Sequence, residues 1–433
     1  RPTNPGMSQA VEIDEGSLML SLINLDPALE VALMGALVAL LPVSLVALRA
    51  RQQGLRGWPA WQRVLTVLTL FLTIDLVVFG AFTRLTDSGL GCPDWPGCYG
   101  ETSPFAAHAQ ISTAHAALPS GPVSHSKAWI EMVHRYLATG VGALITGLMV
   151  AAWLMRDRVG ALSPWWATAT MVWVCAQGAF GALTVTLKLQ PIIVTGHLIG
   201  AMLGVGLLTA QVRVLDMPQM QPRLREAWAA SSLRKAGYVV LALLAMQIAL
   251  GAWVSTNYAV LACTEVPMCQ GQWWPEMDFR GGFQILRPLG VGSDGGFITL
   301  AALTAIHVAH RLMAALVLLA LVVYGWALRH WQHVWSGGQG PWQRDGAALW
   351  WLAGLQLATG LSNVVLGWPL VAALVHTLGA ALMVWRLVHV LTCPALSARL
   401  REAVQGPKNK TGAGLLDPSH QGLHAGEPQA SAS

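Results

Sequence analysis

Charged residues are scarce in this chain of 433 amino acids: Asp, Glu, Lys and Arg make up 11% of it, against about 25% in ordinary soluble domains. Hydrophobic residues make up 54%, and the mean hydropathy is +0.52. This composition excludes an ordinary soluble domain. It predicts an all-α polytopic membrane protein that contacts membrane lipid.

Two other features are missing. Lys and Arg do not gather on one face or in one tail, so the net charge of +5 does not indicate nucleic-acid binding. The first apolar run lacks a basic region before it and a small-residue cleavage site after it, so we expect no cleavable signal peptide. We therefore count this run as a membrane span.

Long apolar runs dominate the rest of the chain, and a run of about 20 residues is long enough to cross a bilayer as a helix. They predict nine spans, near 31–48, 64–83, 130–152, 166–187, 192–212, 236–255, 299–325, 347–366 and 370–391.

The basic residues fall in alternate loops between these spans. The main ones are Arg49, Arg51, Arg56, Arg63, Arg156, Arg158, Arg213, Arg223, Arg225, Arg234, Lys235, Arg329, Arg344, Arg399 and Arg401. Loops rich in Lys and Arg stay in the cytoplasm. We therefore expect the N-terminus outside, the C-terminus in the cytoplasm and the other loops on the periplasmic side of a bacterial inner membrane.

Four of the six cysteines form two pairs with the same spacing, Cys92 with Cys98 and Cys263 with Cys269, and both pairs fall in outside loops. That side of a bacterial inner membrane is oxidising, so we expect two disulfides. Cys175 and Cys393 lie in or beside spans, and we expect them to be inert.

Landmarks of the first half return in the second half in the same order. The equivalent pairs are Cys92 and Cys263, His134 and His310, Gln177 and Gln356, and His197 and His376, at offsets of 171 to 179 residues. Such a nearly constant offset indicates an internal repeat. Each half has four spans in the same orientation, which predicts two pseudo-symmetric four-helix transmembrane bundles, a parallel repeat, plus one extra N-terminal span.

This pattern divides the chain into five parts. They are an N-terminal leader, extra span and basic linker at 1–62, the first bundle at 63–215, a cytoplasmic linker at 216–233, the second bundle at 234–395 and a disordered cytoplasmic tail at 396–433. The tail is polar and rich in Gly, Pro, Ser and Lys, a composition that cannot bury enough apolar surface to fold.

Four histidines mark the bundles, His134 and His197 in the first and His310 and His376 in the second. Each lies roughly four to eleven residues inside a span that starts outside, so at about 1.5 Å per residue all four lie in the outer half of the bilayer. In each bundle they come from the second and fourth helices, which allows two imidazoles to ligate one haem iron. A proton or ion pathway is the alternative, and Asp75 near mid-membrane is either functional or hydrogen-bonded to a neighbouring helix.

The neighbours of the first histidine differ between the halves. Glu131 lies three residues before His134 and on the same helix face, whereas His307 holds this place in the second half. A carboxylate can move protons, so we expect a reactive first site and a supporting second one, with helix capping as the alternative for Glu131. Arg135 and Arg311 either donate to a haem propionate or extend to the outer interface.

Together these residues resemble the haem A synthase family in its cysteine-bearing bacterial form. The resemblance covers about 64–391. It rests on the run TRLTDSGLGCPDWPGC at 83–98, Glu131-x-x-His134-Arg135, Gly196-His197, His310-Arg311 and His376.

The resemblance implies an oxidoreductase that acts on a CH group. It would convert the C8 methyl of haem O to the formyl group of haem A by successive hydroxylation, through an alcohol and a gem-diol that loses water. It implies a haem b cofactor on His310 and His376, and substrate haem O near His134 and His197.

The resemblance also assigns the remaining motif residues. Glu131 matches the family's essential glutamate, which we expect to handle protons or stabilise a charged intermediate. Cys92 and Cys98 match a pair with a role in reductant or haem handling, so the second pair would be structural. Haem O synthase is the expected upstream partner and haem–copper oxidase assembly the destination, while the electron donor or acceptor and the oligomeric state stay open.

Two features depart from the family pattern. The extra N-terminal span and the tail lie outside it. His307 competes with His310 as a ligand, and we prefer His310 because its His-Arg pair aligns with His134-Arg135.

Two other functions compete with this interpretation. A b-type dihaem membrane cytochrome that takes electrons from quinol explains four histidines, but it leaves Glu131 and the first cysteine loop without a role. A haem carrier or assembly factor needs both sites but no turnover.

Overall fold

The computed structural model describes residues 26–157, 162–215, 228, 231–292, 295–336 and 341–392. The predicted leader before residue 26, most of the 216–233 linker, Cys393 and the 396–433 tail lie outside the described residues.

The described part of the chain consists of helices joined by loops. The long helices are α2 (Asp26–Gln52), α3 (Trp58–Leu85), α5 (His125–Leu154), α6 (Pro164–Thr186), α7 (Pro191–Leu215), α9 (Ser232–Thr256), α11 (Leu300–Ser336), α12 (Pro341–Val365) and α13 (Leu370–Leu391). Within the described residues, nine helices are long and apolar enough to cross a membrane. The predicted fold class and the nine spans are therefore confirmed.

Most helices extend past the apolar runs, because the backbone ladder continues after the side chains become polar. α3 starts at Trp58 rather than near 64. Pro164 and Pro191 open α6 and α7, where a missing N–H costs nothing. Ser124 caps α5 by accepting a hydrogen bond from the N–H of Lys127 at 3.3 Å.

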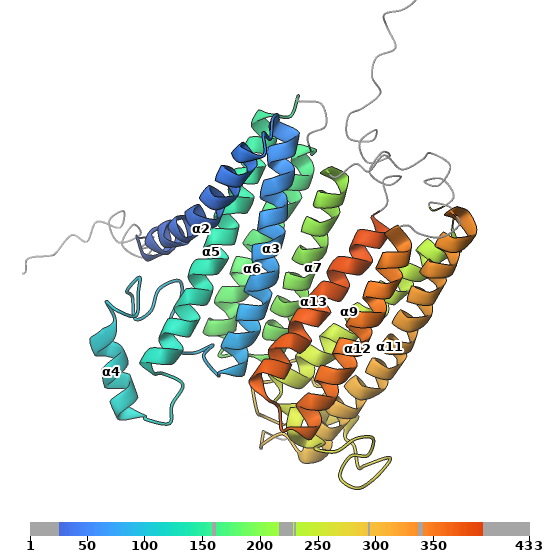
Figure 1. Cartoon of the computed structure of the whole chain (residues 1–433). Coiled ribbons are helices and arrows are strands. Elements are labelled where there is room, and N and C mark those ends of the chain that lie inside the picture. Colours follow the sequence, from blue (N-terminus) through green and yellow to red (C-terminus); the bar gives the residue numbers. More distant parts are fainter. Residues whose placement is uncertain are drawn as a thin grey trace, which may run out of the picture.

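The long helices after α2 form two groups that lie side by side (Figure 1). One group holds α3, α5, α6 and α7, and the other holds α9, α11, α12 and α13. They meet where α7 packs against α9 and α13, and α3 packs against α13. The largest buried apolar cluster spans this contact, with Val77 and Leu208 from the first group and Leu244 and Leu387 from the second.

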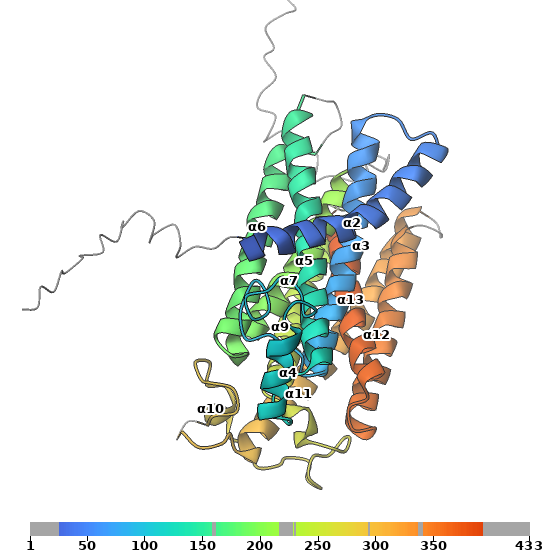
Figure 2. The same ribbon diagram turned by 90° about the vertical axis from the view of Figure 1, so that its left-hand side faces the viewer.

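Two long loops lie at the same end of the molecule (Figures 1 and 2). One carries α4 (His108–Ala117) between α3 and α5. The other carries the short turn η1 (Ala259–Ala262) and α10 (Phe279–Gly282) between α9 and α11. Each loop contains one cysteine pair, so both pairs lie on one side of the membrane.

Helix α2 runs obliquely across α5 on the outer side of the first group (Figure 2). Small residues allow a close crossing: a Cβ on Gly140 would lie 2.8 Å from the carbonyl oxygen of Gly35. The Thr139 hydroxyl lies 3.2 Å from the carbonyl oxygen of Val31 on α2, to which it donates. The extra span thus packs against the helix that carries His134.

Candidate functional site

The first-half histidines belong to different helices, His134 to α5 and His197 to α7. The two imidazoles are close enough to interact electrostatically. Each faces a glycine on a neighbouring helix: a methyl group on Gly80 would lie 3.1 Å from Cε1 of His134, and one on Gly181 3.7 Å from Cε1 of His197. The repeat therefore brings both predicted ligands of the first half together.

The second-half histidines repeat this arrangement. His310 of α11 and His376 of α13 also interact electrostatically. A methyl group on Gly251 would lie 2.9 Å from Cε1 of His310, and one on Gly360 3.5 Å from Cε1 of His376. Glycine therefore faces an imidazole four times, so each ring lies against bare backbone.

This donor set fits a haem better than a bare metal ion. Each half supplies two imidazoles, and a haem iron needs only two axial ligands because the macrocycle supplies the rest. In the second half the Nδ1 atom of His376 lies 2.9 Å from the Thr359 hydroxyl. A ring held at Nδ1 keeps Nε2 available for iron.

Glu131 lies one turn nearer the loops than His134 and is buried, with 4% of its surface exposed. Its Oε2 accepts a hydrogen bond from the backbone N–H of Cys92 at 2.8 Å, and its Oε1 accepts one from Nη2 of Arg135 at 2.6 Å. A buried carboxylate needs such partners because desolvation is costly. The carboxylate therefore connects the histidine helix to the cysteine loop.

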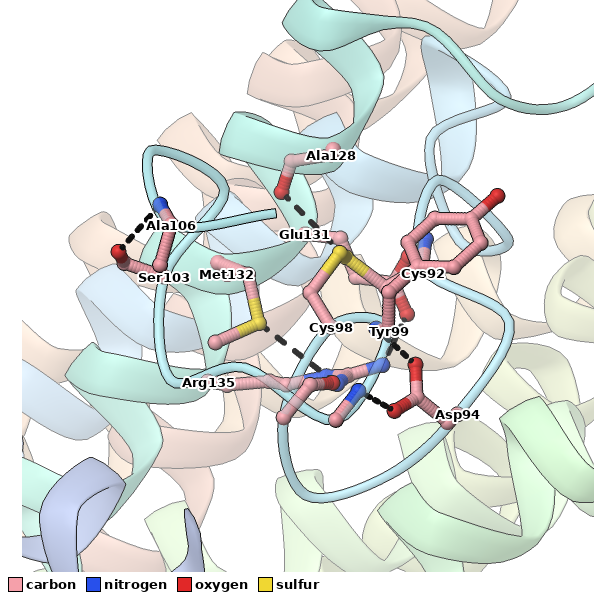
Figure 3. The surroundings of a disulfide bond; sticks show 12 residues. Cys92, Asp94, Cys98, Tyr99, Ser103, Ala106, Ala128, Glu131, Met132 and Arg135 are labelled. Atoms are coloured by element: carbon pink, nitrogen blue, oxygen red, sulfur yellow. Dashed lines mark hydrogen bonds and ion pairs between the residues drawn. A yellow bond between two sulfur atoms is a disulfide. The ribbon is translucent and has the colours of Figure 1, made fainter. Parts of the chain in front are cut away.

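Arg135 holds the same loop from its other side (Figure 3). Its Nη1 donates to the carbonyl oxygens of Gly97 and, at 3.1 Å, Pro96. In the second half, Arg311 donates to the carbonyl oxygens of Met268 at 3.1 Å and Cys263 at 3.2 Å. Both arginines therefore clamp a cysteine loop, and their predicted contacts with haem propionates stay predictions.

The structure joins Cys92 to Cys98 and Cys263 to Cys269 in buried disulfides. The first loop is closed by Asp94, whose carboxylate accepts hydrogen bonds from the backbone N–H groups of Tyr99 and Gly100 at 2.6 and 2.7 Å (Figure 3). The disulfide and the Asp94 carboxylate thus hold this loop in a defined conformation.

His307 occupies the position of Glu131 in the second half and is buried. Its Nδ1 lies 2.9 Å from the carbonyl oxygen of Ala259 in η1. Like Glu131, it therefore bonds to the loop backbone. The preference for His310 over His307 as the iron ligand stays a prediction.

Two other residues were singled out from the sequence. Asp75 lies on an exposed face of α3, without a hydrogen bond to any other described residue. The hydrogen bond expected between Asp75 and a neighbouring helix is thus not formed within the described chain. Cys175 is a free, exposed cysteine on α6.

Sequence reasoning missed the residues that support the histidines. These are the four glycines and two polar partners, Gln247 beside His310 and Thr359 beside His376. The repeat contained the signal: at the same offsets Gly80 pairs with Gly251, Leu76 with Gln247 and Phe180 with Thr359. Reading the repeat position by position would have shown both the shared glycines and the unequal polar residues.

Residues 63–388 match the family model COX15-CtaA, described as cytochrome oxidase assembly protein. A protein of Shewanella oneidensis named heme A synthase is 34% identical over 325 residues, which are 75% of this chain and 93% of that protein. Proteins with the same name from Rhizorhabdus wittichii and Halalkalibacterium halodurans are 27% and 26% identical, over 76% of this chain and 94% and 95% of theirs. The histidine pairs, the buried glutamate and the cysteine loops thus belong to a chain that is a member of the COX15-CtaA family, the family of the haem A synthases.

Proposed function

We propose that this protein is a haem A synthase, a membrane oxidoreductase that converts the C8 methyl group of haem O to a formyl group. The observation that carries the proposal is the pair of repeated two-histidine sites. Among the described residues, only the first site has a buried carboxylate one turn away. A purely electron-carrying protein needs the histidines but gives that carboxylate no role.

The two halves take different roles in this proposal. The first bundle (63–215) holds the substrate haem O between His134 and His197, and the second bundle (234–395) holds haem b between His310 and His376. The assignment is supported by Glu131, whose place is taken in the second half by His307. When bound in the second half, haem b supplies one-electron redox chemistry close to the substrate.

Glu131 handles protons at the substrate. Turning a methyl into a formyl group breaks two C–H bonds and forms one C=O bond. With water as the source of the oxygen atom, the conversion releases four electrons, which an electron carrier takes, and four protons. Glu131 lies one helical turn from His134, so its carboxylate can reach the edge of a haem bound there. At that edge it would accept or return protons. Its bonds to Cys92 and Arg135 fix its position before substrate arrives.

In this proposal the first cysteine loop is a lid over the substrate site, and it is held at three points. Glu131 binds the Cys92 end, Arg135 binds the Pro96 and Gly97 carbonyls, and the Tyr136 hydroxyl donates to the carbonyl of Thr102 at 2.6 Å. All three side chains come from α5, the helix of His134. The lid thereby keeps water from the site and sets Cys92 and Cys98 beside it, where they would pass reducing equivalents or assist haem transfer.

The cellular setting follows from charge placement. We place the protein in a bacterial inner membrane with the N-terminus and both cysteine loops on the periplasmic side and the C-terminus in the cytoplasm, because basic residues gather in the opposite loops. Haem O synthase supplies the substrate, the product goes to haem–copper oxidases, and an electron carrier still to be identified takes the electrons.

The test is to co-express the protein with haem O synthase, purify it, extract its haems and separate them by chromatography. Haem B together with haem O or haem A is expected. Haem B alone would indicate a b-type cytochrome instead. Haem O bound without conversion to haem A under aerobic turnover would indicate a haem carrier.

A further inference from the structure

The four imidazoles are supported unequally. In the second half, Nδ1 of His376 lies 2.9 Å from the Thr359 hydroxyl, and Nδ1 of His310 lies 3.1 Å from the side-chain amide nitrogen of Gln247. In the first half, the Nδ1 atoms of His134 and His197 are both buried without a hydrogen-bond partner among the described residues.

The two halves differ in the residues that lie at the positions of these hydrogen-bond partners. The repeat places Leu76 where the second half has Gln247, and Phe180 where it has Thr359. Neither a leucine nor a phenylalanine accepts a hydrogen bond from an imidazole. His134 is packed instead against the ring of Phe79, at 6.2 Å between centroids and 5° between planes.

The Thr359 contact also fixes which nitrogen of His376 carries the proton. The single hydroxyl hydrogen of Thr359 points to the carbonyl oxygen of Leu355 at 2.8 Å, so the hydroxyl accepts from Nδ1–H of His376. Nε2 is then left with a free lone pair, which is the state that binds iron.

Gln247 can support His310 in the same way. Its amide nitrogen lies 3.1 Å from Nδ1 and 3.4 Å from Nε2 of His310, while its Oε1 is buried without a partner. A half-turn of the amide group exchanges its oxygen and nitrogen and places Oε1 beside Nδ1. Oε1 gives up no hydrogen bond in this turn, because it has none among the described residues. Gln247 then accepts from Nδ1–H.

We infer that Gln247 and Thr359 are positioning residues that retain a haem in the second half, and that Leu76 and Phe180 keep the first half exchangeable. This inference rests on the proposed function, in which haem b stays while haem O enters and haem A leaves. A hydrogen bond at Nδ1 orients an iron-binding imidazole and makes it a stronger ligand. Imidazoles without a hydrogen bond at Nδ1 bind iron less tightly, which suits a site that must release its product in each turnover.

The test measures haem transfer from the purified protein to excess apomyoglobin, together with the midpoint potential of the retained haem. Thr359→Val should speed loss of the second-half haem by about 10- to 100-fold, as for other outer-shell partners of metal ligands, and shift its potential upward. Gln247→Leu, which copies Leu76, should act in the same direction. Thr359→Ser restores the hydroxyl and should restore both values.

The reciprocal change is Leu76→Gln, which should slow the loss of the first-half haem. The haems are told apart by repeating the measurement in a His134→Ala background, where only the second site has both ligands. Wild-type transfer rates and potentials in Thr359→Val and Gln247→Leu would overturn the inference. Both readouts need only bound haem, so failure to form haem A would reject the proposed function without affecting them.

Discussion

The hydroxyl of Tyr258 donates to Oδ1 of Asp87 at 2.7 Å, and the two residues are equivalent positions of the repeat, 171 residues apart. A second equivalent pair lies beside them: Nη2 of Arg84 donates to the carbonyl oxygen of Ser255, and these residues are also 171 positions apart in the sequence. The Arg84 guanidinium also lies 4.1 Å from the centre of the Tyr258 ring. Residues related by the pseudo-two-fold axis thus contact each other and join the two halves beside the cysteine loops.

This contact predicts a response to alkaline pH. Burial raises the pKa of Tyr258, the bond to Asp87 raises it further, and Arg84 opposes both. The unfolded chain then loses the proton first, so this residue's contribution to stability is present below pH of about 10 and falls as pH rises. Tyr258→Phe should lower the free energy of unfolding at pH 8 by less than about 1 kcal/mol. It should also flatten the decline of Tm above about pH 10.

The measurement is the thermal unfolding of detergent-purified protein at a series of pH values. An unchanged alkaline slope in Tyr258→Phe would contradict the assignment. Tyr238→Phe is a suitable control, because Tyr238 lies near the start of α9, whereas Tyr258 follows the end of that helix.

The buried carboxylate predicts a loss of turnover without loss of cofactor. Glu131→Ala should leave haem B bound while abolishing haem A formation, and Glu131→Gln should reduce the rate by about 10²- to 10⁴-fold, the usual contribution of a proton-transfer group. The measurement is haem extraction after co-expression with haem O synthase. His307→Gln makes the equivalent change in the second half, and it should leave haem A formation intact if His310 is the iron ligand there. Loss of all haem from the Glu131 variants would assign this residue a structural role.

The two arginine clamps predict separable effects on the two loops. Arg135→Lys removes the fork that reaches Glu131 and two loop carbonyls, so amide hydrogen exchange should increase in 92–101. Arg311→Lys should loosen only 263–272. Exchange is read by mass spectrometry of proteolytic fragments. If either variant instead releases haem with its loop still protected, the arginine holds a propionate, which is one of the two roles that the sequence left open.

The disulfides predict an unequal effect of their removal. Each closes a loop with a sequence separation of 6 residues, which corresponds to about 2 kcal/mol of stabilisation by chain entropy. Cys263→Ser with Cys269→Ser should cost stability but leave turnover, whereas Cys92→Ser with Cys98→Ser should also reduce turnover. Mass spectrometry of unreduced wild-type protein should show both bonds. Free thiols at Cys92 and Cys98 would reject the first of them.

The nine spans and the repeat could be predicted because a helix that crosses lipid needs a long apolar run, which is easily recognised in a sequence. A chain in hydrocarbon must satisfy its backbone within each span, so the apolar runs predicted nine helices and the offsets of Cys92 and His134 revealed the repeat. The partners of the site residues were not predictable in the same way. Arg135 faces the Gly97 carbonyl because of how the loop folds back, and spacing along one helix says nothing about a loop residue 38 positions earlier in the chain.

For Asp75, the sequence did not predict the direction in which the side chain points. Its position within an apolar run indicated a role or a partner in a neighbouring helix, yet α3 turns it outward to an exposed face. In a membrane span the protein-facing side need not be the more apolar one, and the buried side of α3 includes Gln62, Thr66, Thr69 and Thr73. Which face of α3 meets α5 and α7 therefore depends on packing, for example where Gly80 faces His134.

The glycines that face the imidazoles carry the last prediction. A methyl group on Gly251 would lie 2.9 Å from Cε1 of His310 and one on Gly80 3.1 Å from Cε1 of His134, so either alanine forces the ring to move. Overpacking of this kind costs about 1–3 kcal/mol, and a displaced ligand binds iron less well. Gly251→Ala should therefore lower the haem B content of purified protein, and Gly80→Ala the content of haem O and haem A. Gly147→Ala on α5 is the control, because its methyl group meets no atom within 4 Å and should leave the haem content unchanged. Equal haem content in all three variants would mean that the imidazoles do not bind iron from the positions they hold here.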